Sequence, residues 1–363
     1  MSSLQIAGRA IGPDHPPYVI AELSGNHNGD LGQALRIIDA AVEAGADAVK
    51  IQTYRPDTIT LDSDAPDFQI TEGLWKGRTL YELYEWAHTP WEWHEALFAH
   101  AAKRGITLFS SPFDPTAVDL LESLGAPAYK IASFEAVDLP LIRYVAAKGK
   151  PMIISTGMAD AEEIAEAVEA ALEGGCRELA LLHCVSGYPA PAEDYNLRTL
   201  PDMAERFGTV VGLSDHTLDN TTAIASVALG ASIIEKHVTL DRNGGGPDDS
   251  FSLEPPELAE LCRASRTAWD AIGRVDYGRK SSEQDNVKFR RSLYFVQDLP
   301  AGTTIKPQHI RSVRPGFGLE PKYIHDVTGL LTSCDVYANT PVTTEKIYSD
   351  TRRAQRFALR NKT

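Results

Sequence analysis

Short apolar runs rich in β-forming residues alternate with longer amphipathic stretches over the first three quarters of the chain. The runs are VIAEL near residue 20, AVKIQTY near 50, TLFSSPF near 109, AYKIASF near 130, MIISTGM near 154, ALLHCVS near 182, VVGLSDHT near 213 and SIIEKHV near 235. Between most of them, apolar residues recur at three- and four-residue spacing, as over 31–43, 93–104, 161–173 and 256–272, which predicts helices. Eight such units predict an α/β fold of the (β/α)8 TIM-barrel type. A doubly wound sheet is the alternative, but it would need fewer strands and usually a glycine-rich turn after the first.

Nearly every apolar run begins with buried-type residues and ends in polar or charged ones. The polar endings are Glu22, Lys50, Gln52, Ser110, Ser111, Lys130, Ser133, Glu135, Ser155, Thr156, His183, Ser186, Ser214, Asp215, His216, Glu235, Lys236 and His237. Barrel enzymes assemble their sites at the carboxyl ends of the strands, where side chains from different strands converge. We therefore expect these residues to form one pocket.

The connection after the second strand is unusually long, from about residue 55 to residue 91, and it is rich in tryptophan and tyrosine. Long loops in compact domains are more often functional than idle. The aromatic residues are equally compatible with a small core that folds the insertion on itself and with a lid or subunit contact.

The composition changes after residue 272. A polar, basic stretch, GRVDYGRKSSEQDNVKFRRS, indicates a linker, and the segment after it has short strand patterns with proline–glycine punctuation up to about Tyr348. We therefore predict a catalytic barrel over residues 1–275, a linker over 276–291 and a small β-rich domain over 292–363.

Charge and targeting signals narrow the class of protein. The formal net charge of −15 argues against a nucleic-acid binder, because such proteins neutralise phosphates with clustered Lys and Arg. The N-terminus lacks the basic start and apolar core of a signal peptide, and no stretch of about 20 apolar residues could span a bilayer. The cysteines show no CxxC pairing, which favours reduced thiols. We expect a cytoplasmic enzyme that binds neither nucleic acid nor membrane.

His216 and His237 end the seventh and eighth strands, which are neighbours around a barrel, so their imidazoles could share one divalent ion. Two imidazoles without an obvious third ligand leave positions for water and substrate, which suits a Lewis acid more than a closed zinc site. Imidazole ligands fit Mn²⁺ better than Mg²⁺.

Cations and hydroxyls surround the same predicted mouth, namely Lys50, Lys130, Ser133, Ser155, Thr156 and Ser214. Such a set fits a compact dianion like a phosphate ester. Glu22 and Glu135 are placed to orient sugar hydroxyls or to move protons. A lysine at a strand end, Lys50, Lys130 or Lys236, could alternatively form the imine of a Schiff-base aldolase.

Seven strings and the tail RPGFGLEP together resemble the sialic acid synthase family over nearly the whole chain: AELSGNHNG, VKIQTY, YKIAS, ISTGM, GLSDHT, EKHVTLD and GPDDSFSLEP. Within it, Leu23-Ser24 and the string GLWKGRTLYELYEWAHTPWEWH are most similar to the pseudaminic acid synthase subgroup. The resemblance implies that the barrel is followed by an antifreeze-like (SAF) domain.

The resemblance also implies roles for individual residues. Phosphoenolpyruvate would be bound by Lys50, Ser111, Lys130, Ser133, Ser155, Ser186 and Ser214. His216 and His237 would bind the metal, expected to be Mn²⁺ with Mg²⁺ or Co²⁺ possible. Gln52, Glu135, Tyr188 and Asp248 would contact an open-chain sugar, with Glu22 near its reacting end. Asp249 stays open as an alternative to Asp248, and Arg314 would reach the sugar's acetamido group.

The implied activity is a metal-dependent condensation of phosphoenolpyruvate with 2,4-diacetamido-2,4,6-trideoxy-L-altrose and water, giving pseudaminic acid and phosphate. N-acetylneuraminate and legionaminic acid synthases are the nearest alternatives, followed by the Schiff-base aldolase and a non-enzymatic sugar-binding or ice-binding protein. The resemblance further implies a homodimer in which the C-terminal domains are swapped between barrels.

Overall fold

A computed structural model describes residues 3–348 of the chain. The chain divides into two units, the first ending at Gly273 and the second beginning at Arg274. No helix in the described range is long and apolar enough to cross a membrane.

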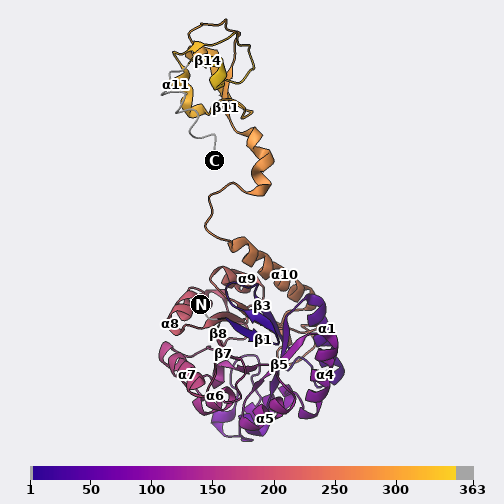
Figure 1. The fold of residues 1–363 in the computed structure, drawn as a ribbon. Coiled ribbons are helices and arrows are strands. Elements are labelled where there is room, and N and C mark those ends of the chain that lie inside the picture. Colours follow the sequence, from indigo (N-terminus) through magenta and orange to yellow (C-terminus); the bar gives the residue numbers. More distant parts are fainter. Residues whose placement is uncertain (1–2, 349–363) are drawn as a thin grey trace. The chain divides into compact units, whose positions relative to one another are not determined.

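Eight parallel strands close into a barrel in the first unit (Figure 1). They are β3 (Tyr18–Glu22), β4 (Ala48–Thr53), β5 (Thr107–Pro112), β6 (Tyr129–Ile131), β7 (Met152–Ser155), β8 (Leu179–Cys184), β9 (Val210–Asp215) and β10 (Ile233–His237). The strands follow chain order around the barrel, and β10 closes it against β3 by pairing His237 with Glu22. The predicted TIM barrel is confirmed, and its parallel strands bring their carboxyl ends to one mouth.

Helices cover the barrel between these strands: α1 (Leu31–Ala44), α4 (His94–Arg104), α5 (Pro115–Ser123), α6 (Leu139–Ala146), α7 (Ala161–Glu173), α8 (Thr199–Phe207), α9 (Thr221–Ala228) and α10 (Pro255–Ile272). The four helices predicted from periodicity begin and end within one residue of these bounds. Local chemistry explains the sharp ends. Asp30 accepts from the first amides of α1, and Gly45 ends that helix in the left-handed conformation that glycine adopts without steric cost.

The amino-terminal hairpin packs at the other end of the barrel. Strands β1 (Leu4–Ile6) and β2 (Arg9–Ile11) are antiparallel, and the residues between them, Ala7 and Gly8, both have positive φ, as a tight hairpin turn requires. The apolar side chains of β1 and β2 join one buried cluster with residues near the starts of the barrel strands, including Tyr18, Phe109 and Ile233. This end of the barrel is therefore filled by hydrocarbon.

The connection from 55 to 91 contains α2 (Pro56–Ile59) and α3 (Leu80–Ala87). Short 3₁₀ segments in the first unit are η1 (Pro66–Phe68), η2 (Trp91–Trp93), η3 (Ser133–Glu135), η4 (Ala192–Tyr195) and η5 (Asp249–Phe251).

The second unit is small and β-rich around its own core. Its strands are β11 (Ser292–Phe295), β12 (Ile310–Val313), β13 (Leu331–Thr332) and β14 (Ile347–Tyr348), with one short helix, α11 (Ile324–Val327), and the 3₁₀ segments η7 (Pro307–His309), η8 (Pro321–Tyr323) and η9 (Thr344–Lys346). Leu293, Phe295 and Ile310 lead the buried cluster. The predicted linker contains η6 (Ser281–Phe289), which buries no side chain. Residues 349–363 of the predicted C-terminal domain lie outside the described range.

Candidate active site

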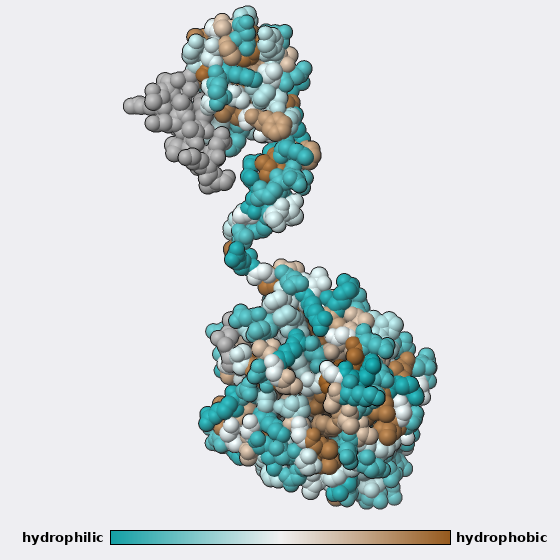
Figure 2. All heavy atoms as spheres, turned by 45° about the vertical axis from the view of Figure 1, so that its right-hand side comes forward, coloured by the Kyte–Doolittle hydropathy of each residue, from teal (hydrophilic) through white to brown (hydrophobic). Residues whose placement is uncertain are grey.

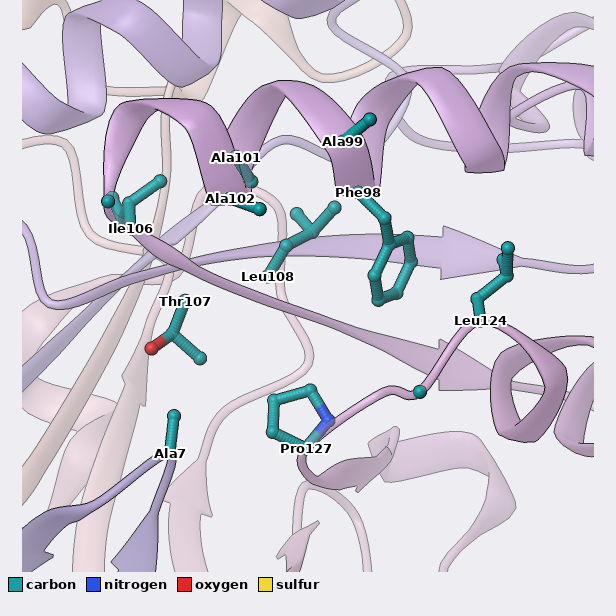
Figure 3. Close-up of a pocket in the computed structure, with 12 residues that line it drawn as sticks. Ala7, Phe98, Ala99, Ala101, Ala102, Ile106, Thr107, Leu108, Leu124 and Pro127 are labelled. Atoms are coloured by element: carbon teal, nitrogen blue, oxygen red, sulfur yellow. The ribbon is translucent and has the colours of Figure 1, made fainter.

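A cavity of about 440 Å³ opens where the barrel strands end. Gln52 of β4 and His237 of β10 line it, together with Glu135, Tyr188 and Asp248 from the loops that follow other strands. A groove of about 600 Å³ lies elsewhere, between α4 and the first residues of β5 (Figure 3). That groove is lined by residues such as Phe98, Leu108 and Pro127 and by no titratable side chain, so unlike the mouth cavity it offers no acid–base or ionic chemistry.

Two lysines and two glutamates form a buried charge cluster inside the barrel, each at most 6% exposed: Glu22, Lys50, Lys130 and Glu235. Lys50 Nζ lies 2.8 Å from Glu22 Oε2 and 3.5 Å from Glu235 Oε1, and Lys130 Nζ lies 3.2 Å from Glu235 Oε1. Lys50 also donates to Ser111 Oγ at 3.1 Å. The four charges balance one another, which is the condition for ions to persist in a low-dielectric interior.

Burial and pairing set the protonation of this cluster. Burial raises the pKa of Glu22, with Lys50 opposing the shift, and burial lowers the pKa of Lys130. For Lys50, burial acts to lower the pKa, but the carboxylates of Glu22 and Glu235 outweigh it and raise the pKa. For Glu235, burial acts to raise the pKa, but the two lysines outweigh it and lower the pKa. The cluster thus keeps Lys50 as a cation that can meet an anionic substrate.

Serine hydroxyls surround the lysines. Ser155 Oγ and Ser214 Oγ lie 2.8 Å apart, and Ser133 Oγ accepts from the backbone N–H of Gly157 at 3.2 Å. A Cβ at Gly157 would lie 2.3 Å from Ser186 Oγ and 2.9 Å from Ser133 Oγ, so only glycine fits at this position. All seven side chains predicted to bind phosphoenolpyruvate therefore come from strands β4 to β9 or the turns directly after them.

His216 and His237 face one another, with ring centroids 5.5 Å apart. His216 Nδ1 lies 2.8 Å from the carbonyl oxygen of Val185, which can only accept, so Nδ1 carries the proton and Nε2 keeps its lone pair. His237 Nδ1 is buried without a hydrogen-bond partner and lies 3.7 Å from Asp248 Oδ2. Burial lowers the pKa of His216 to about 4 and that of His237 well below its usual value.

Neutral imidazoles with free lone pairs fit a divalent metal ion. Within residues 3–348, no third His, Cys, Asp or Glu gathers with this pair to complete a closed site. A metal held here would therefore keep coordination positions for water and substrate.

The loop after β10 separates the roles of its two aspartates. Asp248 lines the cavity and accepts a hydrogen bond from Ser24 Oγ at 2.6 Å. Asp249 is turned inward, where it accepts from Asn28 Nδ2 at 3.1 Å, from the backbone N–H of Gly246 at 2.7 Å and from the Thr239 hydroxyl. Burial raises the pKa of Asp248 to about 6. Of the two, Asp248 is the one available to a bound molecule.

The remaining sugar contacts predicted in the barrel lie at the same mouth. Gln52 Nε2 donates to Glu22 Oε1 at 3.0 Å, and the Tyr188 ring lies 4.4 Å from that of His216. Glu135 follows β6, and burial raises its pKa to about 7, which suits a group that exchanges protons near neutrality. Arg314 lies in the second unit with its side chain exposed.

The sequence interpretation of Lys236 as a cation of the pocket is wrong. Successive side chains of a strand point to opposite faces, so Lys236 points away from the interior that Glu235 and His237 share. Its Nζ donates to Asp215 Oδ2 at 2.9 Å and to the Thr217 carbonyl at 2.6 Å. Lys236 is thus a structural ion pair and cannot act as an aldolase lysine at this mouth.

Glu235, predicted only as a polar strand ending, pairs with both lysines. Ser24, which holds Asp248, and Trp75, which lines the cavity from the insertion, were not among the predicted site residues. The alternation of facing along SIIEKHV puts Glu235 on the same side as His237 and could have identified its place in the site.

Comparisons with known proteins agree with this geometry. Residues 37–277 match the NeuB family and residues 290–347 match the SAF domain. A pseudaminic acid synthase of Campylobacter jejuni is 44% identical over 89% of this chain and 94% of its own length, and one of Helicobacter pylori is 41% identical over 92% and 98%. A crystal structure of N-acetylneuraminic acid (sialic acid) synthetase from Leptospira borgpetersenii superposes with a TM-score of 0.71 at 31% identity, covering 80% of this chain and 96% of that one. The resemblance inferred from the sequence motifs is confirmed, and the chain belongs to the NeuB family.

Proposed function

We propose that this chain is a pseudaminic acid synthase, which condenses phosphoenolpyruvate with open-chain 2,4-diacetamido-2,4,6-trideoxy-L-altrose and water to give pseudaminic acid and phosphate. The observation that carries the proposal is the buried cluster of Lys50, Lys130, Glu22 and Glu235 near a cavity lined by His237, whose ring lies 5.5 Å from that of His216. It stands in a chain whose relatives named pseudaminic acid synthase are 41% to 44% identical.

The reaction forms one carbon–carbon bond and breaks one carbon–oxygen bond. C3 of phosphoenolpyruvate attacks the aldehyde carbon, whose oxygen takes up a proton. Water adds to C2, and the bond from C2 to the phosphate oxygen breaks, so that phosphate leaves. Lys50 and Lys130 balance the phosphate and carboxylate charges, while Ser111, Ser133, Ser155, Ser186 and Ser214 donate to their oxygens.

His216 and His237 would hold the divalent ion, with Mn²⁺ as the first choice and Mg²⁺ or Co²⁺ as alternatives. When bound, the ion supplies Lewis-acid polarisation of the aldehyde oxygen. Gln52, Tyr188 and Asp248 orient the sugar. Glu22 lies beneath its reacting end, and Glu135 can pass a proton near neutral pH.

The deciding experiment is an assay of the purified protein with phosphoenolpyruvate against a panel of acetamido sugars, following phosphate release and product mass. We expect the highest kcat/KM with the 2,4-diacetamido-6-deoxy sugar. A higher value with N-acetylmannosamine, or with the isomer that leads to legionaminic acid, would reassign the substrate within the family. Covalent trapping of pyruvate by borohydride, without metal-dependent phosphate release, would instead support the aldolase.

We further propose that the active unit is a homodimer in which the C-terminal domain of one subunit supplies Arg314 to the barrel mouth of the other. The loops after β6, β7 and β9 expose apolar side chains, including Phe134, Met158 and Leu218, each more than half exposed. Figure 2 shows hydrophobic residues interrupting a mainly hydrophilic surface on the face in view. The linker residues outside η6 can extend by ~3.3 Å each, which gives the C-terminal domain reach for an exchange between subunits.

Mixing an Arg314→Ala subunit with a His237→Ala subunit tests this arrangement. If Arg314 acts in trans, a heterodimer has both lesions at one mouth and none at the other, so up to about half the activity per heterodimer returns. If Arg314 acts in cis, each mouth keeps one lesion and no activity returns. Arg314→Ala alone should weaken sugar binding by about 1.5–3 kcal/mol, as for a hydrogen bond from a charged group, with little change for phosphoenolpyruvate.

A cytoplasmic location is part of the proposal. Cys176, Cys184, Cys262 and Cys334 are all free thiols, and Cys334 is exposed, as expected in a reducing compartment.

A further inference from the structure

The aromatic insertion between β4 and α4 forms one side of the mouth cavity. Its contributions to the lining are Tyr54, Ile59, Ile70, Glu72, Trp75, Leu80, Leu83, Tyr84 and Ala87. Apart from Glu72, the two tyrosine hydroxyls and the indole N–H, these side chains are apolar. The barrel strands and their loops supply the polar groups assigned to the sugar, Gln52, Glu135, Tyr188 and Asp248, and also His237 and the apolar residues Phe113, Ala132, Phe134 and Pro247. The barrel side of the cavity is therefore the polar side, and the insertion forms a mainly apolar side.

The insertion is joined to the barrel at the points where the sugar would bind. The Trp75 indole N–H donates to the carbonyl oxygen of Pro247 at 2.8 Å, immediately before Asp248. The Trp75 ring also lies 5.7 Å from that of Tyr188. A molecule held by Asp248 and Tyr188 must therefore lie beside Trp75.

A second contact fixes the far end of the insertion. A Cβ at Gly25, in the loop after β3, would lie 3.2 Å from the carbonyl oxygen of Ala87 and 2.5 Å from Pro247 Cγ. The C-terminal end of α3 thus packs against the barrel loop as closely as backbone allows. The insertion is not folded only on itself; its apolar side chains are a built part of the cavity.

We propose that Ile59, Ile70, Leu80, Leu83 and Trp75, here called the apolar wall, determine substrate specificity by receiving the 6-deoxy end of the sugar. The inference rests on the proposed function. An open-chain hexose bonded to the polar side through its hydroxyl and acetamido groups directs its remaining methyl end to the apolar wall. A hydroxyl at C6 would lose its water there without gaining a partner.

The apolar character of the wall sets how strongly the protein should prefer the 6-deoxy sugar over the 6-hydroxy sugar. A hydrophobic surface rejects an otherwise identical ligand with one added hydroxyl by about a hundredfold at most, whereas a site built to hydrogen-bond that hydroxyl discriminates far more strongly. We therefore expect the wild-type protein to prefer the 6-deoxy sugar over the matching 6-hydroxy sugar by roughly 10- to 100-fold in kcat/KM.

The test compares these two 2,4-diacetamido sugars, with phosphoenolpyruvate as co-substrate, in the full-length chain. Leu80→Asn places a hydrogen-bonding amide on the wall, at a half-buried position that tolerates it, and should reduce the preference at least about tenfold. Ile70→Thr, which keeps the β-branch but replaces hydrocarbon with a hydroxyl, should act in the same direction. Leu74→Asn is the matched control, because Leu74 belongs to the same insertion, is 48% exposed and does not line the cavity.

An unchanged preference in both Leu80→Asn and Ile70→Thr, with both variants folded by circular dichroism, would overturn the apolar wall. An equal loss of preference in Leu74→Asn would also overturn it, because the effect would then belong to the insertion's folding. If the wild-type protein condenses phosphoenolpyruvate with neither sugar, the proposed function fails instead.

Discussion

The two ends of the barrel are built from the same eight strands and have opposite chemistry. At the strand starts, Tyr18, Phe109, Ile153 and Ile233 pack with the amino-terminal hairpin in one hydrocarbon cluster, and the nearby groove between α4 and β5 has no titratable lining. At the strand ends, buried ions and imidazoles surround a cavity. Strand β10 contributes to both ends, because it begins with Ile233 of the hydrocarbon cluster and ends with His237 at the mouth.

Each strand therefore contributes to the stability of the fold at its start and to the chemistry of the site at its end. Burying hydrocarbon stabilises the fold in proportion to the area removed from water. Buried ion pairs offset their own desolvation at best, so the mouth adds little net stability for its many interactions. Substitutions that remove volume at the strand starts should therefore lower the free energy of unfolding. Substitutions of a charged or polar side chain by a neutral one at the strand ends should leave the free energy of unfolding nearly unchanged but reduce turnover.

The largest expected effect is at the mouth. His237→Ala should remove nearly all turnover, by about a hundredfold or more, and chelation of the wild-type protein should do the same until Mn²⁺, Co²⁺ or Mg²⁺ is restored. Steady-state phosphate release with and without chelator measures both. His100→Ala, a surface histidine paired with Asp39, is the control and should keep the wild-type response. Full activity of the His237→Ala variant in the presence of chelator would show that the reaction needs no metal ion bound by His237.

A pair of substitutions on β7 tests the separation within one strand. Ile153 and Ser155 point to the same side, one in the hydrocarbon cluster and one at the mouth. Ile153→Ala should lower the free energy of unfolding by about 2–5 kcal/mol and leave kcat/KM unchanged below the transition. Ser155→Ala should change stability by less than about 1 kcal/mol while raising the KM for phosphoenolpyruvate roughly tenfold. If one of the two variants were the more damaged both in the free energy of unfolding and in catalysis, the strand starts and ends would not have these separate roles.

Sequence periodicity was sufficient for the barrel and for the convergence of its polar strand endings, because both follow from local patterns repeated eight times. The polar strand endings alone did not separate Glu235 from Lys236; that separation needs the alternation of side chains along the strand, with His237 as the reference. Periodicity could not identify Ser24 or Trp75 as parts of the site. Their partners, Asp248 and Pro247, lie 224 and 172 residues away in the chain, and no local spacing records such contacts.

A smaller effect concerns the pH dependence of stability at the mouth. Burial raises the pKa of Glu135 from 4.5 to about 7, so the folded state holds this proton more tightly than the unfolded chain. Its contribution is fully present below about pH 4.5 and is lost as the pH rises through about 7. Glu135→Gln mimics the neutral acid, so the variant should gain about 1–2 kcal/mol over wild type between pH 5 and pH 8. Urea unfolding at several pH values measures the difference, and a constant difference would contradict the assignment.

The smallest effect on stability is expected at Ser24, where a substitution should change kcat/KM much more than the free energy of unfolding. Ser24 has a φ of 44°, a left-handed conformation that costs a non-glycine residue about 1–2 kcal/mol, and its hydroxyl donates to Asp248. Ser24→Gly relieves the backbone but removes that hydrogen bond, so unfolding should change by less than about 1 kcal/mol while kcat/KM for the sugar falls roughly tenfold. Ser24→Ala keeps the strained backbone and also lacks the hydroxyl. The two variants should therefore share the kinetic defect and differ in stability, with the glycine variant more stable. Wild-type kinetics in either variant would show that the Ser24 hydroxyl does not hold Asp248 for the sugar, whereas equal stability of the two would show that the backbone at this position carries no strain.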